Sequence, residues 1–114
     1  MNRQLIALAL IWILQGSQAR AAEAFSGNEM LRGCQNHTQR NNNSDPYGQG
    51  ICMGVVANTF YYRSRFDVCT PAGSNVGQAI RIVTRYLDTH PARTHEDFRK
   101  LVVEALQEAW PCTR

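Results

Sequence analysis

The chain has 114 residues, of which 18% are charged, and a formal net charge of +3. A chain of this length favours a single domain. The charge excess is small, and no basic patch is interleaved with aromatic residues, which argues against a nucleic-acid partner.

The chain begins with a segment typical of an export leader. A short basic start precedes the apolar run Leu5–Leu14, which is too short to span a bilayer comfortably. Ala19 and Ala21 fit the small residues of a signal-peptidase site, and we expect cleavage after Ala21. The sequence thus predicts a signal peptide at residues 1–21 and a mature helical domain at residues 22–114, with no membrane attachment after cleavage. Two of the twelve basic residues lie in the leader, so the mature charge falls to +1.

The first predicted helix runs from Gly27 to Asn36. Ser26 precedes it, and Glu29 lies three residues further on, which is the spacing of a capping box. The stretch that follows, residues 37–50, contains three consecutive asparagines, a proline and two glycines without apolar periodicity. This composition predicts a loop.

The second and third helices are predicted from apolar spacing. Residues 51–66 show apolar positions three and four apart, and the length of the run favours a helix over the alternative of two strands. A Pro/Gly turn follows, after which Ser74 or Asn75 can cap a helix over residues 76–89. Pro91 stops that helix.

The last helix is predicted to begin with Thr94 as its N-cap and Asp97 at the third position, and to close at Trp110 before a proline. Four helices with short connections favour an up-down arrangement. The predicted fold class is therefore all-α, a small disulfide-stapled helical bundle of about four helices.

Four cysteines remain in the mature chain, and in an exported protein they predict two disulfides. Their gaps of 17, 16 and 42 residues do not resemble the close ligand pairs of a zinc site. Sequence alone allows three pairings, but an up-down bundle brings Cys34 beside Cys52 and Cys69 beside Cys112. The other two pairings require cysteines of different hairpins to meet.

No catalytic constellation is evident. The chain lacks a G-x-S-x-G motif and a glycine-rich phosphate loop. His90 and His95 flank a turn, but His95, Glu96 and Asp97 are consecutive and therefore point to diverging sides of a helix. We therefore expect no enzyme activity, no cofactor and no metal site.

An ordered set of residues resembles the Rap1a/Tai family of immunity proteins. The resemblance covers about residues 34–112, and it departs from the family pattern at Val55 and Ala92. The matching residues, in order, are Cys34, Cys52-Met53-Gly54, Cys69-Thr70-Pro71-Ala72-Gly73, Gly77-Gln78, Val83, Tyr86-Leu87, His90-Pro91, His95 and Ala109-Trp110-Pro111-Cys112.

This resemblance implies an exported, mostly helical, disulfide-bonded protein of the bacterial periplasm that often forms a homodimer. It implies that the protein binds and blocks a peptidoglycan amidase effector of a type VI secretion system, without chemistry of its own. The alternative is a small periplasmic stress or chaperone-like protein without an amidase partner. For an inhibitor, exposed turns on a rigid scaffold favour these contact residues: Arg85, Tyr86, Asp88, Thr89, His90, Arg93 and His95.

Overall fold

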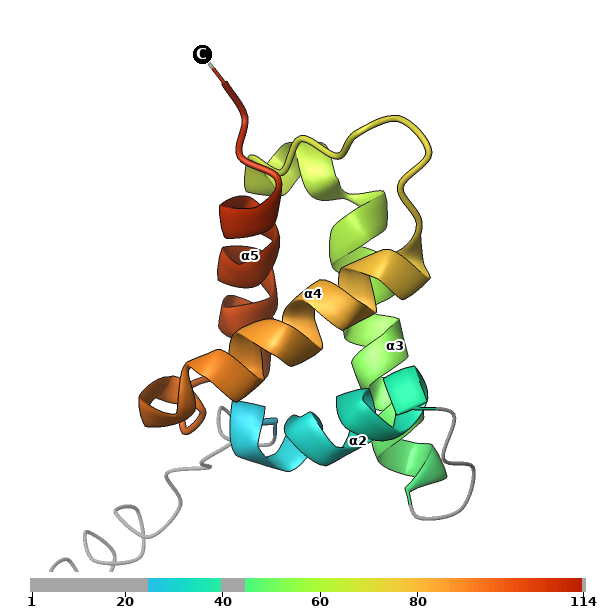
Figure 1. Cartoon of the computed structure of the whole chain (residues 1–114), viewed down its shortest axis with the longest axis vertical. Coiled ribbons are helices and arrows are strands. Elements are labelled where there is room, and N and C mark those ends of the chain that lie inside the picture. Colours follow the sequence, from blue (N-terminus) through green and yellow to red (C-terminus); the bar gives the residue numbers. More distant parts are fainter. Residues whose placement is uncertain (1–24, 40–44, 114) are drawn as a thin grey trace, which may run out of the picture.

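The computed structural model describes residues 25–39 and 45–113, and the predicted signal peptide lies outside them. The described chain forms the α-helices α2 (Gly27–Gln39), α3 (Pro46–Tyr61), α4 (Val76–Thr89) and α5 (Phe98–Ala109) (Figure 1). Two short 3-10 helices, Arg63–Phe66 and Pro91–Arg93, follow α3 and α4. The predicted all-α class is confirmed. None of these described helices combines the length and apolarity needed to cross a membrane.

The predicted capping box at the start of α2 is present. The backbone N–H of Ser26 donates to Glu29 Oε2 at 2.8 Å, and the backbone N–H of Glu29 lies 3.3 Å from Ser26 Oγ. These bonds satisfy N–H groups that the first turn of a helix leaves without a partner. α2 then continues to Gln39, three residues beyond its predicted end.

The predicted loop over residues 37–50 is wrong at both ends, because α3 begins at Pro46 rather than at residue 51. Asp45 is the N-cap, and its Oδ1 accepts from the backbone N–H of Gly48 at 2.8 Å. Proline suits the first position of a helix, since the N–H that it lacks would be unpaired there. The helix also stops earlier than predicted, at Tyr61, and the chain tightens into the 3-10 turn Arg63–Phe66.

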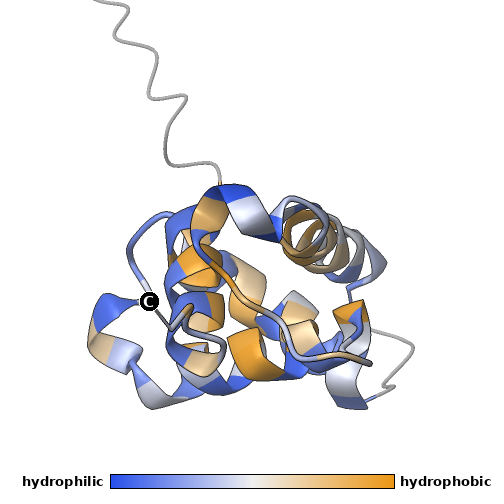
Figure 2. Ribbon diagram, turned by 90° about the horizontal axis from the view of Figure 1, so that it is seen from above, coloured by the Kyte–Doolittle hydropathy of each residue, from blue (hydrophilic) through white to orange (hydrophobic). Residues whose placement is uncertain are grey.

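The helices do not share one axis, which departs from a simple up-down bundle. α2 and α4 run across the directions of α3 and α5 (Figure 1). Their apolar faces meet in one core, and the hydrophobic parts of the ribbons face inward (Figure 2). The largest fully buried side chains are Val56, Ile80, Val83, Leu87, Phe98, Leu101, Val102 and Leu106.

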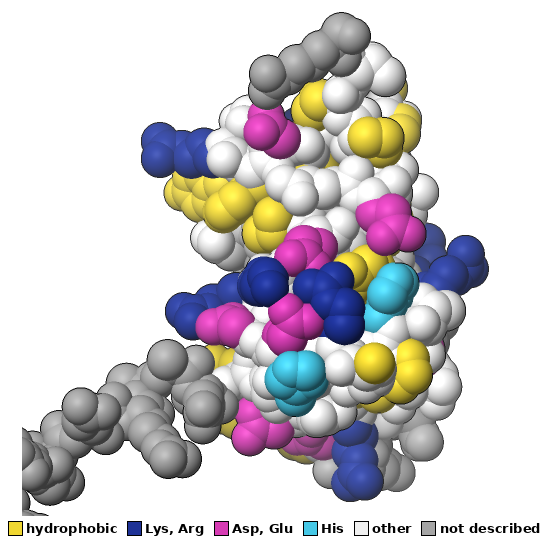
Figure 3. Space-filling view, turned by 90° about the vertical axis from the view of Figure 1, so that its left-hand side faces the viewer, with side chains coloured by type: hydrophobic (Ala, Val, Ile, Leu, Met, Phe, Trp, Pro, Cys, Tyr) yellow, Lys and Arg dark blue, Asp and Glu magenta, His cyan; other side chains and the backbone are white. Residues whose placement is uncertain are grey.

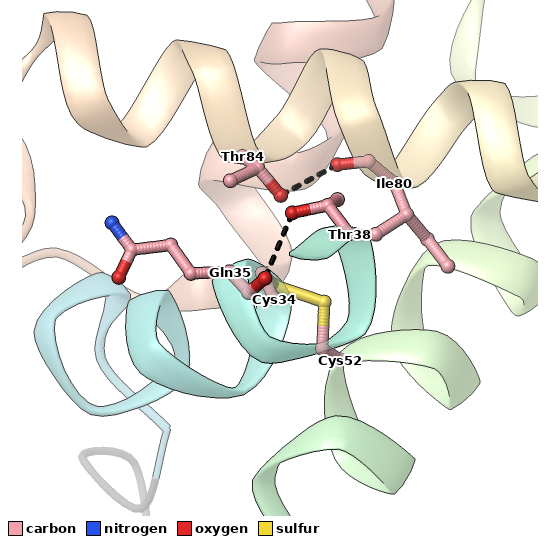
Figure 4. Close-up of a disulfide and its surroundings, with 6 residues drawn as sticks. All are labelled: Cys34, Gln35, Thr38, Cys52, Ile80 and Thr84. Atoms are coloured by element: carbon pink, nitrogen blue, oxygen red, sulfur yellow. Dashed lines mark hydrogen bonds between the residues drawn. A yellow bond between two sulfur atoms is a disulfide. The ribbon is translucent and has the colours of Figure 1, made fainter. Parts of the chain in front are cut away.

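Both predicted disulfides are confirmed. Cys34 and Cys52 join α2 to α3 with Cα atoms 5.4 Å apart, and both are fully buried beneath α4 (Figure 4). Cys69 and Cys112 have Cα atoms 5.0 Å apart. The backbone N–H of Cys69 donates to the carbonyl of Trp110 at 2.9 Å, which aligns the segment before α4 with the end of α5. The prediction of the two disulfides required only that the segments carrying each pair of cysteines lie side by side. It did not require the helices to be parallel.

The start of α5 corrects a second prediction. Thr94 is not its N-cap; the helix begins at Phe98, and Asp97 caps it by accepting from the backbone N–H of Arg99 at 2.9 Å. The Thr94 carbonyl accepts from the Asn28 N–H at 2.7 Å, and the Phe98 N–H donates to the Phe25 carbonyl at 2.7 Å. The groups that would close a first helical turn at Thr94 are therefore bound to the chain around the start of α2.

Candidate functional site

The helix α4 has the predicted bounds and separates a buried face from an exposed face. Asn75 caps it, with Oδ1 accepting from the Gln78 N–H at 2.9 Å. Ile80, Val83 and Leu87 are at most 1% exposed. The opposite face is solvent-exposed and carries Arg81, Arg85, Asp88 and Thr89. This exposed face is the part of α4 that a partner can reach.

The connection from α4 to α5 is fixed by a set of polar side chains that we call the turn cluster: Tyr86, Arg93, Glu96, Lys100 and Glu104. Arg93 is its centre. Its Nε and Nη2 donate to Glu96 at 2.6 and 3.2 Å. Its Nη2 also donates to Glu104 at 2.6 Å. Its Nη1 donates to the Tyr86 hydroxyl at 2.7 Å. Lys100 Nζ donates to Glu96 at 2.6 Å. Figure 3 shows basic and acidic side chains gathered side by side on this face, with histidines next to them.

These contacts shift the ionisation of the turn cluster. Hydrogen bonds from Arg93 and then Lys100 lower the pKa of Glu96 from 4.5 to about 2. The same bond to Glu96, and a second to Glu104, raise the pKa of Arg93. Burial raises the pKa of Tyr86. Arg93 and Glu96 therefore keep their charges across the neutral range, and the contacts of the cluster tie residues 86–104 together.

His90 completes the turn. Its ring stacks on the Tyr86 ring with centroids 4.0 Å apart, and its Nδ1 lies 2.8 Å from the Tyr86 carbonyl oxygen. A carbonyl oxygen only accepts, so this contact places the proton on Nδ1. The Thr89 hydroxyl donates to the Arg85 carbonyl at 2.9 Å. His90 thus braces the end of α4.

Two grooves lie beside the exposed face of α4. The larger, of about 460 Å³, lies toward α5 and has the apolar side chains Ile82, Ala105 and Ala109 among its lining. The smaller, of about 260 Å³, lies toward α2, where Gln35 Nε2 donates to Asp88 at 2.9 Å. Arg81 and Arg85 line both grooves and form the ridge between them.

The seven predicted contact residues fall into three groups in the structure. Arg85, Asp88 and Thr89 are exposed and line the grooves. Tyr86, His90 and Arg93 are more enclosed and hold the turn through bonds within the chain, and the first two also line the larger groove. His95 is exposed but lines neither groove.

The sequence analysis missed Arg81 on the ridge and three members of the turn cluster. The missed cluster residues are Glu96, Lys100 and Glu104, whose spacing of four places them on one side of a helix. This Glu-Lys-Glu spacing could have indicated that the three side chains lie together on one side of a helix. Arg81 lies four residues before Arg85, so the same rule places the two arginines together.

Within the described residues, no group of three or more His, Cys, Asp or Glu side chains is placed to hold a metal ion. The carboxylates of the turn cluster are occupied by Arg93 and Lys100. The arrangement offers an exposed, charged helix face beside a turn that ion pairs hold in place.

A comparison with protein-family models matches residues 26–112 to a family described as Rap1a immunity proteins. The match spans all four described helices and both disulfides. No curated protein and no solved structure matches the chain.

Proposed function

Because the chain belongs to the Rap1a immunity protein family, we propose that it binds and occludes a peptidoglycan amidase effector of a type VI secretion system. Membership of the family indicates a role in immunity against an effector protein. The resemblance in the sequence motifs supports the finer statement that the effector is an amidase. The chain acts by covering the effector and contributes no reaction of its own.

The observation that carries this proposal is the family match over residues 26–112, read together with the exposed face of α4. The disulfide between Cys34 and Cys52 lies beneath α4, and the turn cluster holds the C-terminal end of the helix. A binding surface that is ordered before its partner arrives loses less conformational entropy on association. Occlusion by such a surface needs no catalytic group.

The periplasm is the proposed compartment. Two disulfides persist in an oxidising environment and are rare in the bacterial cytoplasm. The leader predicted at residues 1–21 would deliver the chain there. A wall-cleaving effector would also meet its substrate in this compartment.

The test is a pull-down from a periplasmic extract with the oxidised mature chain as bait, read by mass spectrometry. We expect recovery of an amidase whose cleavage of purified peptidoglycan stops when the mature chain is added. The matched control is the same bait after reduction and alkylation, which removes both disulfides. An amidase that retains full activity at saturating concentrations of the oxidised bait would contradict the proposal.

We also propose that two copies of the chain pair through α3. The exposed large hydrophobic residues of the described chain all lie on α3 or just beyond it, with Tyr47 68% and Tyr61 73% exposed. Gly50 and Gly54 share this face, and a Cβ at either would meet nothing within 4 Å. α3 carries no charged residue, so two copies can approach without like-charge repulsion.

Size-exclusion chromatography with light scattering tests the pairing. We expect the mature chain to have twice its monomer mass and Gly54→Glu to have the monomer mass, because each copy would bring a charge into the contact. Arg32→Glu, on the exposed side of α2, is the control and should leave the dimer intact. A wild-type chain that stays monomeric at micromolar concentration would refute the pairing.

A further inference from the structure

The exposed face of α4 carries two neighbouring arginines. Arg81 and Arg85 are four residues apart on one helix, and both are exposed. Like charges at this spacing destabilise a helix, so the pair is not explained by the stability of α4. No carboxylate in the described part of the chain forms an ion pair with either guanidinium.

The cations of the connection between α4 and α5, and of the first turn of α5, are paired with carboxylates. Arg93 binds two carboxylates in the turn cluster, and Lys100 binds Glu96 at 2.6 Å. Arg99 pairs with Asp97 at 2.5 Å. The chain thus has the means to pair its cations within the fold, and it leaves this adjacent pair open.

The larger groove beside these arginines combines charge with an apolar lining. Ile82 and Ala105 contribute apolar surface, Glu108 lines it with a carboxylate, and Arg81 and Arg85 contribute the positive charge. Asp88, which lines the smaller groove, accepts from Gln35 instead of pairing with Arg85. Neither lining carboxylate, Glu108 nor Asp88, forms an ion pair with Arg81 or Arg85, so both guanidinium groups stay available to a partner.

On the basis of the proposed function, we infer that the effector segment seated on this ridge is acidic. It has carboxylates that meet Arg81 and Arg85 and an apolar side chain that enters the larger groove. Arginine binds carboxylates through two parallel hydrogen bonds, and opposite potentials across an interface speed association and fix its register. Charge complementarity thereby selects which effector the chain neutralises.

Charge reversal with the recovered amidase tests this inference. We expect Arg81→Glu with Arg85→Glu to weaken binding by at least about tenfold. The double Lys variant keeps the charge but loses the paired hydrogen bonds of the guanidinium groups, so its affinity should lie between those of the wild type and the double Glu variant. Arg32→Glu is the control for net charge and should leave the affinity unchanged. Thermal melts of all variants establish that the fold is kept.

Salt provides a second readout of the same contact. Raising the salt from about 0.1 M to about 1 M shortens the Debye length from roughly 10 Å to 3 Å. The association rate of the wild type should fall over this range, whereas that of the double Glu variant should change little or rise. Equal binding and equal salt dependence of wild type and double Glu variant would overturn the acidic-segment inference and leave the immunity function standing.

A probe that does not depend on any effector separates the two proposals. Acetyl-Asp-Leu-Asp-amide is titrated at millimolar concentration into the ¹⁵N-labelled mature chain, with acetyl-Lys-Leu-Lys-amide and inorganic phosphate as comparisons. We expect the acidic peptide alone to shift the amide signals of Ile82, Arg85 and Ala105. Absence of shifts, or the same shifts with the basic peptide or with phosphate, overturns the inference. If the acidic peptide shifts these signals but no amidase is recovered, the ridge is supported and the amidase partner fails.

Discussion

Replacing Gly33 by alanine tests how closely α2 and α3 must approach. An added Cβ would lie 2.3 Å from the carbonyl carbon of Gly48 and 2.4 Å from its oxygen. Ordinary van der Waals contact begins near 3.4 Å, so the helices must separate by about 1 Å. Both opposing atoms are backbone and cannot rotate away. The neighbouring Cys34 is held to Cys52 with Cα atoms 5.4 Å apart, which opposes that separation.

The expected cost follows from two opposing terms. Overpacking of this kind costs about 1–3 kcal/mol, and we expect the upper part of that range because the obstacle is backbone. Replacing a glycine inside a helix by alanine returns about 0.5–1 kcal/mol. The net loss in the free energy of unfolding is then about 2 kcal/mol, which lowers the melting temperature of a domain this size by roughly 8–16 °C.

The assay is a thermal melt of the oxidised proteins followed by circular dichroism. Gly50→Ala and Gly54→Ala are matched controls on α3, because a Cβ at these positions meets nothing within 4 Å. Each control should melt at or slightly above the wild-type temperature when the proteins are compared at a concentration at which they are monomers, because Gly50 and Gly54 lie in the proposed contact between copies. A Gly33→Ala protein that melts with the controls would refute the close approach of α2 and α3.

Three further predictions concern the second disulfide and the turn cluster. Replacing Cys69 and Cys112 by alanine should cost about 4 kcal/mol in denaturant unfolding, against about 3 kcal/mol for the other disulfide, because the loops span 43 and 18 residues. The pKa of Glu96 is lowered from 4.5 to about 2, so its stabilising contribution is complete above about pH 4.5 and is lost as the pH falls toward 2. Glu96→Gln should therefore reduce the loss of stability measured between those pH values. Arg93→Met should lower the melting temperature, because it removes the donor shared by Glu96 and Glu104, whereas Arg85→Met should not.

Signals within one turn of a helix were readable from the sequence. The capping box of Ser26 and Glu29 and the cap at Asn75 involve residues three apart; the first forms as predicted, and the second forms at one of the two residues, Ser74 or Asn75, that the sequence allowed. The pair Asp45-Pro46 is an equally local signal for the start of α3. The asparagine-rich stretch before this pair led instead to the prediction of a loop over residues 37–50.

The start of α5 could not be read locally. Thr94 and Asp97 have the spacing of a shortened capping box, yet the Thr94 carbonyl is bound by Asn28. That hydrogen bond joins segments more than sixty residues apart in the sequence. Tertiary pairing of this kind satisfies the same backbone groups that a cap would, so a local pattern cannot distinguish the two outcomes.

The predicted contact residues surround the turn between α4 and α5, and the structure shows which of them are exposed and which hold the turn. Side-chain spacing places Arg81 with Arg85, and Glu96 with Lys100, because both pairs lie within single helices. The reach of Arg93 to Glu104 depends on how the turn returns α5 beside α4. Only the folded chain separates the residues that hold the turn from those that remain available to a partner.

This division makes folding and binding separable by experiment. The turn cluster orders the end of α4, and fixing a flexible side chain on association costs about 0.5–1.5 kcal/mol. Substitution of Arg93 should therefore lower both thermal stability and affinity for the effector. Substitution of Arg81 or Arg85 should lower affinity alone, since neither forms an ion pair within the described chain. The contrary result would be a loss of affinity that is proportional to the loss of stability in the Arg93 variants and in the Arg81 and Arg85 variants alike. Affinity would then depend only on the fraction of folded protein, and the ridge would have no separate role in binding.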